Sequence, residues 1–393
     1  MAQDARQRLT RAAPALDIGV MPSPRRPPFR ADHVGSLLRP EGLHAARARR
    51  KAGDIGEAEL KAVEDRCIRD VVRLQEAAGL QGITDGEFRR AMWHTDFLTG
   101  FDGIEATGGQ YAVTFKGEHG EVTGTSSMLG VVGKVRRSRP IMLDHFAFLK
   151  SVTTRTPKFC IPAATYLHMR GGRRVVDPKA YPDMDEFWAD VAAAYQAEIA
   201  DLAAAGCTYL QIDDVSFAML CDEGVREQVR RDGEDPAALP GLYARIINSL
   251  VAARPYGMSV TVHTCRGNHR SMWMAEGGYE PIAEAVFGQL EVDGIFLEYD
   301  SDRAGGFEPL RYAPKGRRIV LGLVSTKQPM LESKDVLKRR IDEASRFVDL
   351  DDLCLSPQCG FASTEAGNEL TEDDEWRKLE LIVQVAEEVW GGL

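Results

Sequence analysis

The chain has 393 residues, of which 44% are hydrophobic and 27% are charged, with a net charge of -10 and a pI near 5.4. This acidity argues against a nucleic-acid partner, because binding to phosphates requires a basic surface. The longest apolar stretches are far too short to span a membrane, and the length allows one large domain or two ordinary ones.

The cysteines indicate a reducing environment. There are seven of them, an odd number, and their wide spacing does not resemble the disulfide framework of a small secreted domain. We therefore expect a cytoplasmic protein. Residues 1–28 are rich in Arg, Ala and Pro but lack the apolar core of a secretion signal, so we expect a disordered N-terminal tail there.

Apolar runs typical of buried strands alternate with helical stretches from residue 29 onwards. The strand candidates are Ala31–Ser36, Gly82–Asp85, Lys158–Pro162, Thr208–Asp213, Met258–His263, Gly294–Glu298, Arg318–Val324 and Leu353–Ser356. Amphipathic helices are predicted at Met184–Ala205, Leu242–Ala253, Ser333–Phe347 and Asp374–Trp390.

This alternation predicts an α/β fold, a single (β/α)8 TIM barrel covering residues 29–393. One stretch, at about residues 101–144, interrupts the alternation and is rich in Gly, Thr and Val. Its turn signals predict a β-rich insertion between the second and third strands of the barrel.

Polar residues collect where the predicted strands end, which is where a TIM barrel places its active site. His263 and Cys265 lie two residues apart at one strand end and therefore point to the same face. Glu298 ends the next strand, and Cys359 follows the last one. These residue types are zinc ligands, so the four residues form a candidate zinc site. The alternative is that they are ordinary buried core residues, as free cysteines often are.

Such a zinc site favours sulfur chemistry over water activation. Two thiolates and a carboxylate donate three negative charges, which makes the ion a poor generator of hydroxide. A metal-bound thiol, in contrast, loses its proton outright, whereas a free thiol with a pKa of about 8.5 is mostly protonated at neutral pH. A substrate thiol that displaces the weakest ligand, Glu298 or a water, would be the nucleophile of an alkyl transfer.

These motifs resemble the C-terminal catalytic barrel of the cobalamin-independent methionine synthases, whose zinc ligands occur in the same order. Val34-Gly-Ser36 resembles the family segment that contacts the homocysteine carboxylate. Asp85-Gly-Glu87 and Gln211-Ile-Asp213-Asp214 resemble the segments whose acids hold the amino group. The resemblance implies that Ser36, Glu87, Asp213 and the adjacent Asp214 bind the amino-acid substrate.

Other segments depart from the family pattern. The family tryptophan that stacks on folate is absent from the third-strand segment, leaving Tyr166 and His168 as candidates to contact the methyl donor. Lys327 falls near the family histidine that handles protons. His33 is a second candidate for proton transfer, because the unperturbed pKa of histidine lies near neutrality. A structural hydrogen bond is the alternative for His33.

We therefore expect a zinc-dependent thiol alkyltransferase that moves a methyl group from a methyltetrahydrofolate-type donor to homocysteine, giving methionine. One alternative is another donor or thiol, such as methylcobalamin, a methyl-carrier (corrinoid) protein, or an epoxide with a coenzyme M-like thiol. Epoxyalkane:coenzyme M transferase also resembles this single-barrel group. A second alternative is a non-enzymatic zinc-binding accessory barrel. The oligomeric state stays open, with a homodimer as one alternative.

Overall fold

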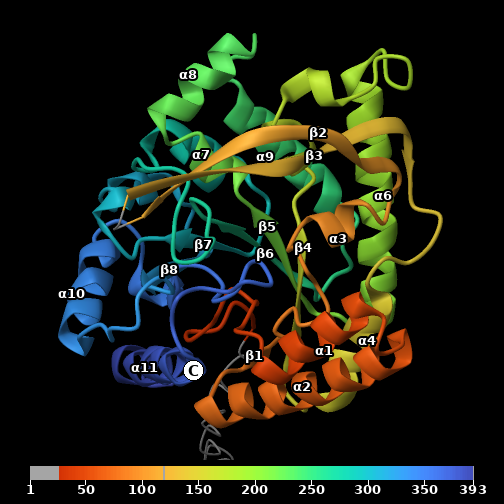
Figure 1. Ribbon diagram of the computed structural model, residues 1–393. Helices are drawn as coiled ribbons and strands as arrows, with labels where there is room; N and C mark the ends of the chain where they lie inside the picture. Colours follow the sequence, from red (N-terminus) through yellow and green to blue (C-terminus); the bar gives the residue numbers. More distant parts are fainter. Residues whose placement is uncertain (1–25, 118–119, 393) are drawn as a thin grey trace, which may run out of the picture.

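A curled parallel sheet forms the centre of the molecule (Figure 1). The computed structural model describes residues 26–117 and 120–392, so nearly all of the predicted tail lies outside the described residues. Seven strands pair in the order β1-β4-β5-β6-β7-β8-β9. They are β1 (Gly82–Ile83), β4 (Thr156–Pro162), β5 (Tyr209–Asp214), β6 (Ser259–Thr264), β7 (Gly294–Glu298), β8 (Arg318–Val324) and β9 (Leu353–Pro357).

Helices surround this sheet, as a parallel barrel requires to bury its outer face. The longer ones are α1 (Glu41–Ala52), α2 (Glu57–Ala78), α4 (Leu143–Val152), α6 (Met184–Ala204), α8 (Glu223–Arg231), α9 (Leu239–Val251), α10 (Lys334–Ser345) and α11 (Glu372–Trp390). Three four-residue helices, α3 (Thr95–Leu98), α5 (Tyr166–Met169) and α7 (Ser216–Met219), lie in loops. Between β6 and β7, a 3-10 turn (Glu280–Ile282) and a π-helix (Glu284–Gln289) replace an α-helix.

The eighth strand position is occupied differently from the prediction. The predicted strand Ala31–Ser36 makes only one parallel bridge, from Ala31 to Leu355 in β9. The backbone N–H groups of Phe29 and His33 donate to the Asp32 side chain, and Gly35 has a φ of +135°. Regular strand pairing fails here because the Asp32 carboxylate accepts backbone N–H groups that would otherwise bond to a neighbouring strand.

The same segment nevertheless fills the gap between β9 and β1. The Thr84 hydroxyl donates to the Gly35 carbonyl at 2.6 Å, and Leu37 N–H donates to the Gly86 carbonyl at 3.1 Å. Strand β1 is shorter than predicted because the Gln75 amide bonds both the N–H and the carbonyl of Thr84 at 2.9 Å. The predicted TIM-barrel class is confirmed, with irregular closure at this seam.

The predicted β-rich insertion is also confirmed. It is an antiparallel hairpin of β2 (Asp102–Gly117) and β3 (Gly120–Arg136), placed between β1 and β4 in the chain. Figure 1 shows the hairpin passing over the sheet. Lys116 at its far end pairs with Trp273 in the loop after β6, through backbone hydrogen bonds of 2.7 and 2.9 Å. Two segments distant in sequence thus meet above the carboxyl ends of the strands.

In the described part of the chain, no helix is both long and apolar enough to cross a membrane.

Candidate metal and substrate site

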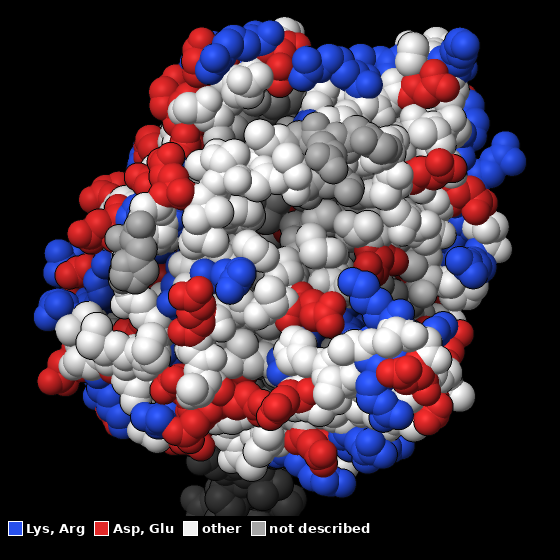
Figure 2. Space-filling view, in the orientation of Figure 1, with Lys and Arg blue, Asp and Glu red and all other residues white. Residues whose placement is uncertain are grey.

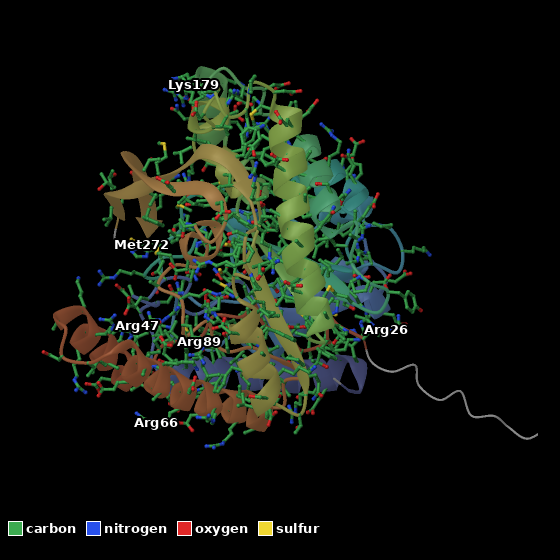
Figure 3. The ribbon with its side chains drawn as sticks, turned by 90° about the vertical axis from the view of Figure 1, so that its right-hand side faces the viewer. Arg26, Arg47, Arg66, Arg89, Lys179 and Met272 are labelled. Carbon is green, nitrogen blue, oxygen red and sulfur yellow. The ribbon has the colours of Figure 1, made fainter. Side chains whose placement is uncertain are left out.

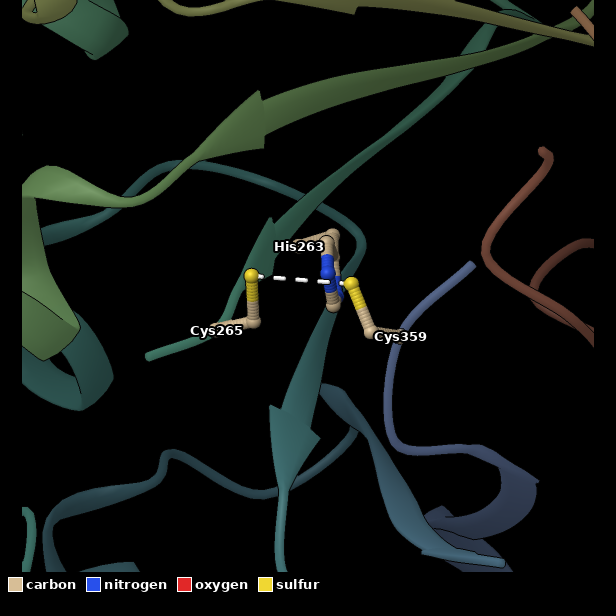
Figure 4. A group of neighbouring side chains, drawn as sticks. All are labelled: His263, Cys265 and Cys359. Atoms are coloured by element: carbon tan, nitrogen blue, oxygen red, sulfur yellow. Dashed lines mark hydrogen bonds between the residues drawn. The ribbon is translucent and has the colours of Figure 1, made fainter. Parts of the chain in front are cut away.

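His263, Cys265 and Cys359 meet at the carboxyl ends of β6 and β9 (Figure 4). One ligand atom from each lies within 4.8 Å of the others, and the two sulfurs are hydrogen-bonded at 3.6 Å. All three residues are buried. Neither ring nitrogen of His263 makes a hydrogen bond of good geometry to a described residue. A buried imidazole without partners beside two thiols fits the donor set of a metal ion.

Local packing explains how Cys359 reaches the strand β6 ligands. Gln358 N–H donates to the Val324 carbonyl at 2.8 Å, which anchors the chain after β9 against β8. A Cβ on Gly360 would collide with the Ser36 hydroxyl. Only glycine therefore lets the turn after Cys359 lie against the seam segment, which brings Ser36 next to the metal-binding group.

The charge distribution of this group favours a thiolate even before any metal binds. The hydrogen bond with Cys265 lowers the pKa of Cys359 well below its usual range, outweighing burial. The same hydrogen bond raises the pKa of Cys265. Burial opposes a charge on His263, but the nearby Cys359 sulfur outweighs burial and raises the pKa of the imidazole. Among the three residues, Cys359 is thus the one that most readily becomes a thiolate.

Glu298 lies beside this cluster but outside its close contacts. Its Oε2 accepts the Arg266 N–H at 2.7 Å. Its Oε1 lies 3.6 Å from both Lys327 Nζ and Arg303 Nη2. Burial would raise the pKa of Glu298, but these cations and Arg266 outweigh burial and lower it. The carboxylate is therefore ionised, and its role as a fourth metal ligand stays a prediction.

A second buried group consists of Glu87, Asp213 and Cys160, whose ligand atoms also lie within 4.8 Å of one another. Burial, together with the mutual repulsion of the two acids, raises the pKa of Glu87 to about 7. Burial likewise raises the pKa of Asp213 to about 6. Arg90 Nη1 is 3.6 Å from Glu87 Oε2. Two acids this close, both with raised pKa values despite the nearby Arg90, form a site that a further positive charge would stabilise.

Local hydrogen bonds hold both acids in place, and at Glu87 the backbone conformation costs conformational free energy. Glu87 has a φ of +60°, which is rare for a residue with a side chain. Its N–H donates to Asp85 Oδ1 at 2.9 Å, and Arg39 donates to its carbonyl at 3.0 Å. The Gln211 amide donates to Asp213 Oδ1 at 2.7 Å. Strain of about 1 kcal/mol or more at Glu87 marks it as a candidate functional residue.

One cavity of about 600 Å³ joins the two groups. Its polar half is lined by Ser36, Glu87, Asp213, Asp214, His263, Cys265 and Cys359. Its apolar half is lined by residues of the hairpin and of loops, including Trp93, Val113, Phe115, Tyr166 and Met272. Figure 2 shows a hollow near the centre of this face, bordered mostly by uncharged residues. In the side view of Figure 3, Met272 lies below the hairpin.

The comparisons with known proteins agree with this geometry. The family described as "Cobalamin-independent synthase, Catalytic domain" matches residues 29–388. The chain belongs to this family. It is a methyltransferase of the methionine-synthase type. Relatives include the uncharacterized protein YxjH of Bacillus subtilis, which is 45% identical over 93% of this chain and 96% of its own.

Other relatives carry more specific names. A methionine synthase of Pyrococcus abyssi is 24% identical over 83% of this chain and 84% of its own. A solved structure from Listeria monocytogenes, provisionally described as a vitamin-B12-independent methionine synthase, is 36% identical with a TM-score of 0.74. The match covers 93% of this chain and 98% of that one. A B12-independent methionine synthase from Shewanella, at 20% identity over 92% of this chain and 97% of its own, with a TM-score of 0.68, shows the same fold.

Not every predicted substrate-binding or catalytic residue reaches the cavity. Ser36, Asp214 and Tyr166 line it, whereas His33, His168 and Lys327 do not. Asp214 accepts the Thr165 hydroxyl at 2.5 Å and Phe217 N–H at 2.9 Å, so its oxygens already hold the start of α7. These contacts offer a structural reason for the acid at this position.

His168 and His33 are both engaged elsewhere. His168 is hydrogen-bonded to Tyr243 at 3.1 Å and lies 3.4 Å from Glu234. It turns away from the cavity because residues two apart on a helix such as α5 face opposite sides. The His33 imidazole is hydrogen-bonded to the Gly82 carbonyl at 3.1 Å, and burial lowers its pKa to about 4. The substrate and proton-transfer roles of these two histidines therefore have no support from the geometry.

Sequence reasoning missed several members of the site. Cys160 was not among the candidate residues, yet its sulfur lies within 4.8 Å of ligand atoms of Glu87 and Asp213. Its place on β4, in register with Gln211 of β5, is the signal that could have found it. Arg90 and Phe115 belong to no recognisable sequence motif. Their place in the site could not be predicted, because it depends on how the loops and the hairpin fold over the barrel.

Proposed function

We propose that this enzyme transfers a methyl group to the thiol of an amino acid, homocysteine, with a zinc ion held by His263, Cys265 and Cys359. The observation that carries the proposal is the junction of two buried groups in one cavity. One group suits a metal and a thiol, and the other suits an ammonium group. Homocysteine carries a thiol and an ammonium group a few bonds apart, and the names of the relatives agree with this substrate.

The zinc would supply a positive charge that keeps the substrate sulfur deprotonated and nucleophilic at neutral pH. The protein side chains determine how the substrate sits. Glu87 and Asp213 accept hydrogen bonds from the ammonium group, which relieves their mutual repulsion. The Ser36 hydroxyl, at the same end of the cavity, donates to the substrate carboxylate. These contacts orient the substrate so that its sulfur lies towards the His263–Cys265–Cys359 group.

The methyl donor would occupy the apolar half of the cavity. The imidazole of His94 stacks on the Tyr166 ring at a centroid distance of 4.0 Å, and Trp93 packs edge-on against Tyr166 at 5.5 Å. Burial, together with the nearby Arg170, lowers the pKa of His94 to about 3, so its imidazole is neutral. A flat aromatic donor of the methyltetrahydrofolate type fits such a surface. Lys327, buried beside Glu298, is outside the cavity.

Turnover assays with purified, zinc-loaded enzyme test the proposal. Homocysteine with methyltetrahydrofolate is expected to give methionine, and removal of zinc by a chelator is expected to abolish the reaction. Turnover with methylcobalamin or a methyl-carrier protein, but not with the folate, would show that the methyl donor is not a folate. The proposed thiol chemistry would then still hold. Full activity of metal-free enzyme would overturn the proposal.

A further inference from the structure

Three charged side chains next to the metal-binding group each have one polar atom without a hydrogen-bond partner among the described residues. The unpartnered atoms are Glu298 Oε1, Lys327 Nζ and Arg303 Nε, all of them buried. Lys327 Nζ and Arg303 Nη2 each lie 3.6 Å from Glu298 Oε1, which is beyond hydrogen-bond distance. Buried polar atoms without partners are rare, so one place with three of them calls for an explanation.

The surroundings fix one end of the Glu298 carboxylate and leave the other end free. Its Oε2 accepts the N–H of Arg266, the residue that follows Cys265. Every nitrogen of the Arg266 guanidinium already donates a hydrogen bond, to the Gly277 carbonyl, the Tyr279 hydroxyl or the Glu298 carbonyl. The backbone N–H of Arg266 therefore fixes Oε2, while its guanidinium is bonded to other acceptors and does not bond to Oε1.

Arg303 and Lys327 are placed to receive Oε1 instead. Arg303 is held by Asp300 at 3.3 Å and stacks over the Trp273 ring at 4.2 Å. Lys327 is 7% exposed, and Glu298 is its one carboxylate within salt-bridge distance in the described chain. Both cations lie within salt-bridge distance of Oε1. Glu298 thus has two alternative positive partners on one side and the His263–Cys265–Cys359 group on the other.

We propose that Lys327 and Arg303 are positioning residues that hold the Glu298 carboxylate while the substrate thiol occupies the place this carboxylate would otherwise take on the metal. The inference rests on the proposed function, because it assumes a metal and an amino-acid thiol at this site. Its physical reason is charge balance. Two thiolates, a substrate thiolate and Glu298 bring four negative charges together, and a displaced carboxylate needs a buried cation to remain ionised.

Binding measurements on zinc-loaded enzyme test this inference without relying on activity. The variants are Lys327→Met and Arg303→Met, which remove charge, and Lys327→Arg, which keeps it. Lys315→Met, at an exposed lysine, is the matched control. Zinc affinity is measured by chelator competition without thiol, and homocysteine affinity by calorimetry under reducing conditions.

The expected signature is a split between the two affinities. Lys327→Met weakens homocysteine binding about tenfold, because the displaced carboxylate loses its partner. Zinc affinity without thiol stays the same or rises, because Lys327 then no longer competes with the zinc ion for the Glu298 carboxylate. Arg303→Met shows the same pattern, and Lys327→Arg restores thiol binding. In a Glu298→Gln background, Lys327→Met has no further effect, as a double-mutant cycle requires.

Two results would overturn the inference while leaving the proposed function intact. One is an equal loss of zinc and homocysteine affinity in Lys327→Met, which indicates a purely structural lysine. The other is unchanged homocysteine binding in both charge-removing variants. Wild-type enzyme that binds neither zinc nor homocysteine would instead overturn the proposed function itself.

Discussion

The two halves of the cavity are built by different parts of the chain. The polar half comes from the strand ends and the residues that follow them, and its acids, thiols and imidazole are all buried. The apolar half comes from loops and the inserted hairpin, where Phe115 is half-buried and Val122 is 55% exposed. The rigid barrel therefore builds the half of the cavity that we propose for the thiol acceptor. The insertion, joined to the loop after β6 by two backbone hydrogen bonds at Lys116, shapes the half that we propose for the donor.

The largest expected effect comes from the sulfur ligands of the polar half. Cys359→Ser or Cys265→Ser should lower zinc affinity by more than about a hundredfold, since loss of even an outer-shell partner costs 10- to 100-fold. Chelator competition with metal analysis measures this change. Cys207→Ser, at a buried cysteine bonded to the Tyr209 carbonyl, is the control and should keep its zinc. Equal zinc binding in all three variants would rule out the cluster as the metal site.

The acids of the polar half should govern recognition of the amino group. Glu87→Gln or Asp213→Asn should raise the KM for homocysteine by about thirtyfold, because a buried ammonium loses a charged partner. A thiol of the same length without the amino group should show no such change, and the KM of the donor should stay constant. If the amino-free thiol is affected equally, the two acids do not bind the amino group.

The pKa of Glu87 predicts a pH dependence for acceptor binding. Its pKa is raised to about 7, so Glu87 is neutral below this pH and negatively charged above it. The KM for homocysteine should therefore rise by about tenfold per pH unit as the pH falls below 7. Steady-state kinetics between about pH 6 and 8, above the pKa of about 6 of Asp213, measure this change, and the slope should vanish in Glu87→Gln. A slope that persists in the variant would assign the titration to another group.

The smallest expected effect comes from the apolar half. Phe115→Ala should raise the KM of the methyl donor by about fivefold, since the half-buried ring contributes about 1 kcal/mol of apolar contact. The KM for homocysteine should stay unchanged, the reverse of the Glu87→Gln pattern. The exposed Tyr256→Ala variant is the control. A rise in both KM values for Phe115→Ala would show that the hairpin supports the whole cavity.

Local patterns in the sequence determined much of this protein. Runs of apolar residues predicted every regular strand of the central sheet, because a strand buried on both faces needs them. The two-residue spacing of His263 and Cys265 placed both on one face of β6, and Cys359 followed at the end of β9. Gly, Thr and Val between residues 101 and 144 predicted the hairpin. These features depend on near neighbours in the chain, so the sequence carries them directly.

The tertiary structure decided what depends on distant partners. Asp32 took the hydrogen bonds that would have made Ala31–Ser36 a regular strand, and helix α5 turned His168 away from the cavity. Glu298 came to lie near Lys327 and Arg303 beside the cluster, and Cys160 joined the acids of neighbouring elements. Each outcome is a competition among side chains far apart in sequence. Its result follows from packing and charge balance, which no local pattern of residues contains.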